Sequence, residues 1–508
     1  MPNAARVNFN IKNFTTEVST PLQGVIFVMG ITKRGPVEQP ELPISLVNSW
    51  AQFEKVFGGL MDTSDFPLLC RRAFSRGAIL RVCRIDSTAT PSVKATAKNI
   101  ANGDGTPVTL FQVQPKYKGA DYNNISIEIK AASNGNSSYW DMAVTHALEP
   151  DLNEYYANIP SFVKASVNSQ TCLDDVKRQS KLLDFTYVDA STATLLIPAV
   201  AAASAFTGGV DPTGQVAADY SSALTAFDGV DDAMVLAIPE MDDDAINAAG
   251  AAYASTRGDL VFFGHLPNSI TTAAALVTER GTISSNTKYL ALYGGGMMVR
   301  HPETLEEVDI SEMGDILGLV AYVHTTFGPW YSLAGQVKGA IPDSLGVVNN
   351  FGTPAKFADL NTLANAQINM AVVKNNVPQL SGNFSAQFQN NSEKFLNVVF
   401  LVIWLKKVLK PILEEYFEEP NDLITFRRIY NHVLPLLTSL TSPQTRALYK
   451  FEYYGDQDAT SLDNLQINDP VDVQNGKYKI NLKIWPIPSL QELTLNLMLV
   501  QGEGVTIG

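Results

Sequence analysis

Short apolar runs alternate with amphipathic stretches along much of the chain, and this alternation limits the fold more than any other feature. Residues 25–31 (VIFVMGI) form a continuous apolar run that stops at Lys33-Arg34-Gly35-Pro36. Such a run is typical of a strand that is buried on both faces, as in a parallel sheet between helices. Ser49 then precedes a helical stretch that ends at Gly58-Gly59, a capping pattern at both ends. The pattern predicts an α/β core.

The same unit returns along the chain. Further strands are expected at residues 78–85, 233–239, 259–267 and 288–295, and further helices at residues 66–75, 219–227, 244–256 and 270–280. Between these two halves, residues 87–206 are rich in Ser, Thr, Asn and Gly and contain short alternating strands such as 125–132 (ISIEIKAA). We interpret this stretch as an inserted β-rich domain in a mainly parallel α/β core.

The last third of the chain has an α+β texture. Helices are expected at residues 361–373, 392–417 (with a bend near Pro411) and 425–440, and strands at residues 448–454, 477–485 and 493–499. This order predicts a separate C-terminal domain.

Strictly alternating strands stand near both ends of the chain. Residues 6–12 (RVNFNIK) place Val7, Phe9 and Ile11 on one face, and the final strand places Leu493, Leu495, Leu497 and Leu499 on one face. A half-buried strand at a chain end needs a sheet to join. The strand at 477–485 has a similar apolar face, formed by Tyr478, Ile480, Leu482 and Ile484.

Pro486-Ile487-Pro488 separates the last two strands and ends their pairing. The final strand therefore cannot return as a tight hairpin.

Composition narrows the function. The 37 Lys and Arg against 51 Asp and Glu give a net charge of −14, which argues against a nucleic-acid binder. Cys70, Cys83 and Cys172 are odd in number and show no CxxC spacing, as expected of buried thiols in a reducing compartment. Residues 1–10 lack the apolar segment of a signal peptide, and the most apolar run, residues 398–405, is too short to cross a bilayer. We therefore expect folding in a cytoplasm.

A search for catalytic chemistry finds no motif in its required context. No GxSxG, HExxH or P-loop sequence occurs, and the five histidines are scattered. Gly208-Gly209-Val210-Asp211 is interpreted as a turn, Asp242-Asp243-Asp244 as the first turn of a helix, and Gly294-Gly295-Gly296 as a flexible turn. The sequence predicts no enzyme, cofactor or metal site.

Several blocks, taken in order, resemble the contractile tail sheath family of myophages, pyocin-like particles and related injection systems. The blocks are residues 24–36 (GVIFVMGITKRGP), 44–59 (ISLVNSWAQFEKVFGG), 66–85 (FPLLCRRAFSRGAILRVCRI), 118–129 (KGADYNNISIEI), 206–214 (FTGGVDPTG), 251–267 (AAYASTRGDLVFFGHLP), 288–304 (KYLALYGGGMMVRHPET), 318–335 (GLVAYVHTTFGPWYSLAG), 418–429 (EEPNDLITFRRI) and 485–493 (WPIPSLQEL). The sequence departs from the family at residues 380–389 (LSGNFSAQFQ), where a Trp-Gly-x-Arg-Thr segment is usual.

The resemblance implies a structural subunit. Sheath subunits form hexameric rings or a helix around a tail tube, exchange terminal strands with neighbours by β-augmentation, and contract to drive the tube through a cell envelope. It implies a homo-oligomer that meets a tail tube protein, baseplate and tail terminator proteins, with no nucleic acid and no membrane insertion. It further implies that flexible roots at residues 19–24 and 486–489 act as hinges of the terminal arms. The particle would be a virion tail or contractile device assembled in a bacterial cytoplasm.

Pattern and resemblance together divide the chain into six parts. They are an N-terminal arm (1–20), a core in two pieces (21–86 and 207–350), an inserted outer domain (87–206), a polymerisation domain (351–488) and a C-terminal arm (489–508). The acceptor sheet for the arms is expected in the polymerisation domain, at the strand that contains Tyr478, Ile480, Leu482 and Ile484.

Two questions stay open at the level of the sequence. Lys406, Lys407 and Lys410 lie within one turn of the long helix and form either a solvated face or a contact with an acidic tube. The alternatives to a sheath are another arm-exchanging protein, of a capsid or a surface layer, and a soluble hydrolase with an unrecognised site.

Overall fold

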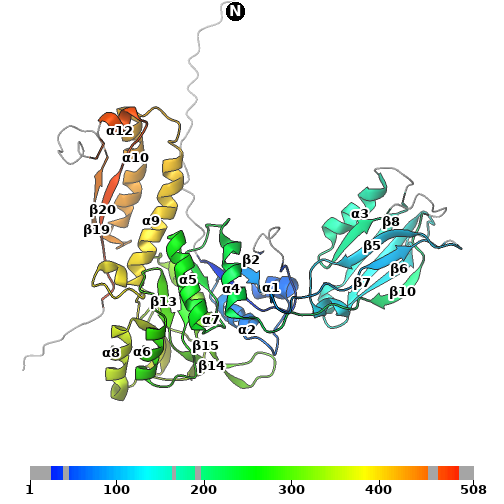
Figure 1. Ribbon diagram of the computed structural model, residues 1–508, viewed down its shortest axis with the longest axis horizontal. Coiled ribbons are helices and arrows are strands. Elements are labelled where there is room, and N and C mark those ends of the chain that lie inside the picture. Colours follow the sequence, from blue (N-terminus) through cyan, green and yellow to red (C-terminus); the bar gives the residue numbers. More distant parts are fainter. Residues whose placement is uncertain are drawn as a thin grey trace, which may run out of the picture.

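The computed structural model describes residues 24–37, 45–103, 105–162, 168–188, 196–455, 467–468 and 470–490. The molecule is elongated and has three parts (Figure 1). A central α/β body lies between a β-rich module, which projects to one side, and a pair of long helices with a small sheet on the other side (Figure 1).

An eight-stranded sheet forms the centre of the body, in the order β18-β17-β13-β12-β11-β1-β3-β2. Six neighbouring strands are parallel, whereas β2 and β18 at the two edges are antiparallel to their neighbours. The strands are β1 (Val25–Gly30), β2 (Ser45–Val47), β3 (Ile79–Arg84), β11 (Val235–Ala237), β12 (Val261–His265), β13 (Leu290–Tyr293), β17 (Ile368–Lys374) and β18 (Val377–Ser381). The predicted mainly parallel sheet is confirmed.

The continuous apolar run at the centre has the expected physical cause. Every residue of β1 is buried. Ile26 and Val28 pack into one core of the body, and Val25 and Phe27 pack into the other. Because alternate side chains of a strand point to opposite faces, a strand covered on both faces must be apolar throughout.

Helices cover both faces of this sheet. One face packs against α1 (Trp50–Phe57), α2 (Phe66–Phe74), α7 (Met313–Thr326) and α9 (Leu396–Glu414). The other packs against α4 (Ala217–Ala223), η3 (Leu224–Phe227), α5 (Asp244–Arg257), α6 (Ala273–Thr282) and α8 (Phe357–Asn365), and η4 (Pro354–Lys356) leads into the last of these.

The predicted helix starts agree with the caps. The Ser49 side chain accepts a hydrogen bond from the amide of Gln52, and Asp243 accepts from the amides of Ala245 and Ile246. The acids at 242–244 therefore serve the start of α5.

A glycine-rich turn lies buried beside a short antiparallel sheet. This sheet consists of β14 (Gly296–Arg300), β15 (Glu307–Ser311) and β16 (Gly346–Val347). Gly294 and Gly295 connect β13 to β14 and are buried, which corrects the expectation of a flexible turn through Gly296. A Cβ atom on Gly295 would stand 2.6 Å from Glu312 Oε2, so the glycine lets this carboxyl approach the backbone.

The β-rich module has a core of its own. A three-stranded sheet (β4-β5-β9) and a four-stranded sheet (β10-β6-β7-β8) enclose it. The elements are β4 (Lys98–Ala101), β5 (Thr109–Pro115), η1 (Ala120–Asn124), β6 (Ile125–Ala131), β7 (Tyr139–His146), η2 (Pro150–Leu152), β8 (Glu154–Pro160), α3 (Asn168–Gln179), β9 (Leu183–Tyr187) and β10 (Ala201–Ala205). The sequence pattern missed α3.

The third part consists of helices and a small sheet. After η5 (Ser392–Lys394), α9 runs from the body and lies beside α10 (Leu423–Leu440) (Figure 1). The strands β19 (Leu448–Tyr454) and β20 (Asn481–Pro486) pair antiparallel, and α12 (Pro470–Gln474) precedes β20. Pro411 lies inside α9.

The expected helix over residues 361–373 is wrong in its second half. The chain leaves α8 at Asn365, takes a positive φ of 61° at Gln367 and then forms the strand β17. This strand is inserted between β13 and β18 and is buried on both faces. It therefore lacks alternation, and a short apolar run of this kind cannot be told from a helix by its spacing.

A buried carboxyl makes stability depend on pH. Burial raises the pKa of Glu312 to about 8, although a hydrogen bond from the amide of Ala371 acts in the opposite direction. The folded chain thus holds a proton that the unfolded chain releases above its ordinary pKa of about 4.3. We expect the free energy of unfolding to fall as pH rises from about 4.3 to 8. Burial also raises the pKa of Glu240 and of Asp315, so Glu312→Gln should keep part of the decline. Denaturant titrations should show a steeper decline in the wild type than in this variant; parallel pH profiles would contradict the assignment.

Candidate assembly surface and inter-domain junction

The sheet of β19 and β20 presents one apolar face to the helices. Phe451, Tyr453, Leu482 and Ile484 pack against the same core as α9 and α10. Tyr478, just before β20, stacks on Phe426 of α10 with ring centroids 3.9 Å apart. Alternation directs these side chains to one side, as the sequence predicted for Tyr478, Ile480, Leu482 and Ile484, and all four are half-buried there.

This sheet has two open edges among the described residues. Each strand pairs only with the other, in a register that sets Phe451 opposite Ile484 and Tyr453 opposite Leu482. An isolated two-stranded sheet is marginally stable, and unpaired edges are templates for further strands. The helices α9 and α10 supply the missing support on one face and so hold this small sheet in place.

The other face of the sheet is polar and aromatic. Lys450 stands 3.9 Å from the ring centroid of Trp485 and is paired with Glu452 at 3.0 Å. Lys483 stands 4.5 Å from the ring centroid of Tyr454. These contacts let a strand with alternating character keep a solvated outer face.

The predicted arm strands themselves are outside the described residues. Val7, Phe9 and Ile11 and also Leu493, Leu495, Leu497 and Leu499 fall there, so strand exchange by these residues stays a prediction.

The three lysines of the long helix have different surroundings. Lys407 is 8% exposed and its ammonium lies 2.8 Å from Asp259 Oδ2. Lys406 donates to the carbonyl of Gly258 at 3.1 Å. Both therefore tie α9 to the turn between α5 and β12. Lys410 is exposed, and a tube contact stays a prediction.

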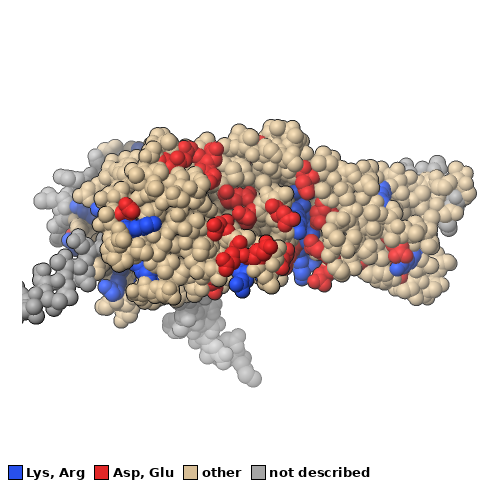
Figure 2. Space-filling model, turned by 90° about the horizontal axis from the view of Figure 1, so that it is seen from below, with Lys and Arg blue, Asp and Glu red and all other residues tan. Residues whose placement is uncertain are grey.

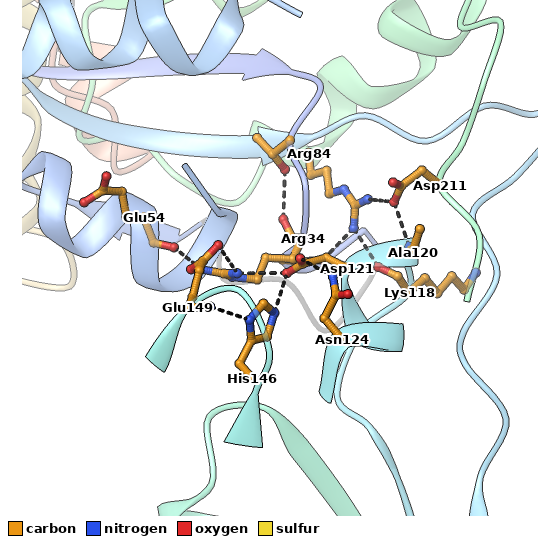
Figure 3. A network of polar contacts seen from close by, with 12 residues as sticks. Arg34, Glu54, Arg84, Lys118, Ala120, Asp121, Asn124, His146, Glu149 and Asp211 are labelled. Atoms are coloured by element: carbon orange, nitrogen blue, oxygen red, sulfur yellow. Dashed lines mark hydrogen bonds and ion pairs between the residues drawn. The ribbon is translucent and has the colours of Figure 1, made fainter. Parts of the chain in front are cut away.

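A network of charged side chains joins the body to the β-rich module (Figure 3). Arg34, at the turn after β1, is 1% exposed. Its guanidinium lies 2.8 Å from Asp121 Oδ2 and 2.7 Å from Glu149 Oε2, both carried by the module, and it also donates to the carbonyl of Glu54 in α1. His146 Nδ1 accepts a hydrogen bond from the amide of Glu149. One buried arginine thus connects three segments far apart in sequence.

Arg84, at the end of β3, makes the second connection. It donates to the carbonyl of Lys118 at 2.8 Å and lies 3.4 Å from Asp211 Oδ1, which also accepts from the amide of Ala120 (Figure 3). A Cβ atom on Gly119 would stand 2.9 Å from Asp211 Oδ1, so this position needs glycine.

The glycine-rich segment at 208–211 belongs to the same joint. Asn123 accepts from the amide of Gly209 at 2.9 Å and donates to its carbonyl at 2.8 Å. A Cβ atom on Gly209 would stand 2.4 Å from the carbonyl oxygen of Gly119. The expected turn is not found there, because Val210 pairs with Val93 in an isolated β-bridge. Gly209 bonds the module's 118–124 segment through Asn123.

The junction fixes the charge of Asp121. Burial alone raises the pKa of this carboxyl, but hydrogen bonds from His146 and Arg34 and their charges outweigh burial and lower it to about 2. The ion pair is therefore present at neutral pH. Without Asp121, the buried Arg34 guanidinium keeps Glu149 as a carboxylate partner, so only part of its charge loses compensation.

Sequence reasoning missed this junction. Arg34 and Asp121 are separated by 87 residues and Arg84 and Asp211 by 127 residues, so no spacing rule connects them. The available signal was an arginine at the carboxyl end of each of two apolar runs, where charge is unexpected unless a partner reaches it.

The place where a parallel sheet of this kind binds ligands is filled by the chain itself. Glu240 follows β11, beside the end of β1, and its side chain accepts hydrogen bonds from Ser64 and from the amide of Phe66 at the start of α2. That helix start would otherwise attract an anion at the topological switch point.

The histidines are engaged structurally. Burial lowers the pKa of His324 to about 3, and its ring contacts Phe400. His265 shares a hydrogen bond with the carbonyl of Gly295, and His432 with Tyr416. Within the described ranges, no three His, Cys, Asp or Glu side chains are grouped so that they could hold a metal ion. No helix in that part of the chain has the length and apolar character needed to span a membrane.

A groove of about 1110 Å³ runs along the junction, and its lining includes seven carboxylates and two lysines. The lining includes Glu54, Asp62, Asp121, Glu149, Asp151, Asp211 and Glu303 together with Lys33 and Lys55. Figure 2 shows acidic side chains gathered across the middle of one face of the molecule.

Comparison with known proteins places the fold. No protein-family model and no curated protein matches the sequence. Among solved structures, the chain is similar to the sheath tail protein from Listeria innocua (TM-score 0.57, 11% identity, covering 91% of this chain and 95% of that one). It is also similar to the sheath tail protein from Desulfitobacterium hafniense (TM-score 0.54, 14% identity, covering 88% of this chain and 91% of that one).

A third similar structure is the PVC sheath complex of an extracellular contractile injection system in its contracted state (TM-score 0.56, 10% identity, 98% of both chains). The chain therefore has the fold of contractile sheath proteins over nearly its full length.

The Asp121 contacts predict how the junction responds to pH. Since the pKa of Asp121 is depressed in the folded chain, its contribution is complete above about pH 4 and is lost as pH falls toward 2. We expect Asp121→Asn to lower the free energy of unfolding by about 2 kcal/mol at pH 7 and by much less near pH 2. Asp151→Asn, at an exposed position in the same groove, is the matched control. Equal effects of both variants at pH 7 would show that the Arg34 pair adds no specific stability.

Proposed function

We propose that this chain is the structural subunit of a contractile tail sheath, linked to its neighbours by exchanged terminal strands. The observation that carries the proposal is the β19–β20 sheet. It is supported on one face and pairs with no further strand among the described residues, in a chain with a sheath fold. Alternating strand sequences near both ends of the chain supply suitable partners for those edges.

Strand addition has a clear physical basis. Each arm of five to seven residues would form several backbone hydrogen bonds, each contributing about 1 kcal/mol. Burial of three or four apolar side chains would add about 1.5–3 kcal/mol each. A shift of one residue would turn the apolar face to solvent, so alternation sets the register.

The proposed division of the chain follows these roles. Residues 1–20 and 489–508 are arms, 21–86 and 207–350 the core, 87–206 the outer domain and 351–488 the polymerisation domain. The buried Arg34 and Arg84 contacts support an outer domain that moves with the core as one body.

Contraction would be a repacking of these bodies while the exchanged strands keep them linked. Six-fold rings stacked around a tube would multiply a small gain per subunit. In this account the subunit is not an enzyme, and the particle is a virion tail or a related device assembled in a bacterial cytoplasm.

The proposed partners are further copies of the chain, a tail tube protein, and baseplate and tail terminator proteins. Among the three lysines of α9, Lys410 fits a contact with an acidic tube best, because it is exposed whereas Lys407 is paired with Asp259.

The alternative to a sheath subunit is a protein that forms another kind of polymer. A capsid or surface-layer protein could also exchange arms, and would form closed shells or flat lattices. The similarity to sheath folds over 98% of the chain favours the cylinder.

Arm deletion tests the proposal. Removing residues 1–15 or 490–508 should leave a folded monomer. Leu490 is the one described residue in these two segments, and it is 79% exposed and belongs to none of the cores. We expect sedimentation velocity to show large polymers for the full chain and monomers for both deletions.

The control is a full-length chain in which the final strand keeps its length but gains polar residues, with Leu495→Asn and Leu497→Asn. This variant should also fail to polymerise. Polymers of normal size from either deletion would refute strand exchange by that arm.

A further inference from the structure

The segment that leads to the C-terminal arm is anchored to the body. After β20, the amide of Ile487 donates to the carbonyl of Ala447 at 3.1 Å. The carbonyl of the same residue accepts from Asn397 Nδ2 at 3.2 Å. Both backbone polar groups of Ile487 are therefore hydrogen-bonded. Pro486 and Pro488, on either side of it, restrict the backbone further. The expectation of a flexible pivot over 486–489 does not fit these contacts.

A pair of buried asparagines forms the anchor. Asn397, in the first turn of α9, is 4% exposed, and Asn383, which follows β18, is 1% exposed. Asn383 Nδ2 donates to Asn397 Oδ1 at 2.9 Å. The amide nitrogen of Asn397 is thereby directed toward two carbonyl oxygens, those of Ile487 and Trp330. We call these two residues the asparagine clamp.

The clamp connects several parts of the fold. The carbonyl of Asn383 accepts from the amide of Leu396, at the start of α9. Trp330 follows α7, and its indole nitrogen donates to the carbonyl of Thr445 at 2.9 Å. Thr445 lies just before β19. Asn383 also lies 3.4 Å from the hydroxyl of Ser489, the last anchored position before the exposed Leu490. An edge strand of the large sheet, the long helix and the small sheet therefore meet at the arm's root.

These hydrogen bonds contribute to stability because the side chains that form them are buried. A carboxamide in the interior costs free energy unless its polar atoms are bonded. Both polar atoms of Asn397 and the Nδ2 atom of Asn383 have partners, whereas Asn383 Oδ1 has none among the described residues. Asn383 lies within residues 380–389, the segment in which the sequence departs from the sheath pattern. The departure thus coincides with one half of the clamp.

We propose that Asn383 and Asn397 are positioning residues that fix where, and in which direction, the C-terminal arm leaves the subunit. The arm's pivot then begins after Ser489 rather than at the Pro-Ile-Pro segment. Since Asn383 lies two residues after the end of the edge strand β18, a pull on the arm passes to the central sheet instead of extending a loop. The proposal deepens the function above and rests on it for the identity of the partner, which is the sheet edge of a second copy.

The primary test measures the anchor directly in the full chain and does not depend on whether the chain assembles. Asn397→Asp keeps the shape and accepts from Asn383, but it cannot donate to the carbonyls of Ile487 and Trp330. We expect amide hydrogen exchange at Ile487 to accelerate about 5- to 30-fold, as the loss of one or two buried hydrogen bonds implies. Exchange in β1 and β12 should be unchanged.

A second variant covers the case in which this carboxylate prevents folding. Asn383→Ala removes the donor that orients Asn397 and adds no charge, and it should accelerate exchange at Ile487 in the same direction by a smaller factor. Asn247→Ala is the matched control, because this buried asparagine of α5 bonds the carbonyl of His265 at a site unrelated to the arm. It should leave Ile487 unchanged.

Assembly separates this proposal from the proposed function. If strand exchange operates, deletion of 490–508 abolishes polymers and the clamp variants assemble more slowly with the arm intact. Slow exchange at Ile487 in folded Asn383→Ala and Asn397→Asp would overturn the clamp, whatever the deletion does. Polymers from the arm deletion would overturn strand exchange but leave the exchange result at Ile487 in force.

Discussion

The central parallel sheet must be covered on both faces, and the rest of the molecule is arranged around that requirement. β1 is buried throughout and supplies side chains to two separate cores. Helices therefore occupy both faces, and additional structure can attach only at the ends or edges of the strands. The β-rich module attaches at the carboxyl ends of β1 and β3 through Arg34 and Arg84. The helix pair and its small sheet attach through α9, whose first half packs on the body.

This arrangement separates two kinds of connection. The module is joined by buried ion pairs and tightly fitted glycines, which resist independent movement. The small sheet is supported by apolar packing on one side and keeps open edges within the described residues. The proposed function would use both kinds of connection, because a subunit linked to neighbours while its body rotates needs a rigid body and an edge to which another chain can bind.

Local sequence patterns predicted the helices and strands that have a clear period of apolar residues or a clear cap. Ser49 and Asp243 cap the expected helices, and the alternating face of Tyr478 to Ile484 packs as expected. The pattern failed at β17, because a short run buried on both faces has no period that distinguishes it from a helix. It also could not identify the partner of Arg34 or the target of the asparagine clamp, since Asp121 is 87 residues from Arg34 and Ile487 is 90 residues from Asn397. The arm strands at residues 6–12 and 493–499 remain predictions.

A cryo-electron microscopy reconstruction of the assembled full-length protein tests the central claim most directly. The account predicts a hollow cylinder of six-fold rings in which the β19–β20 sheet gains strands from residues 6–12 and 493–499 of neighbouring copies. A polymer in which that sheet keeps only its own two strands, or a closed shell in place of a cylinder, would contradict it.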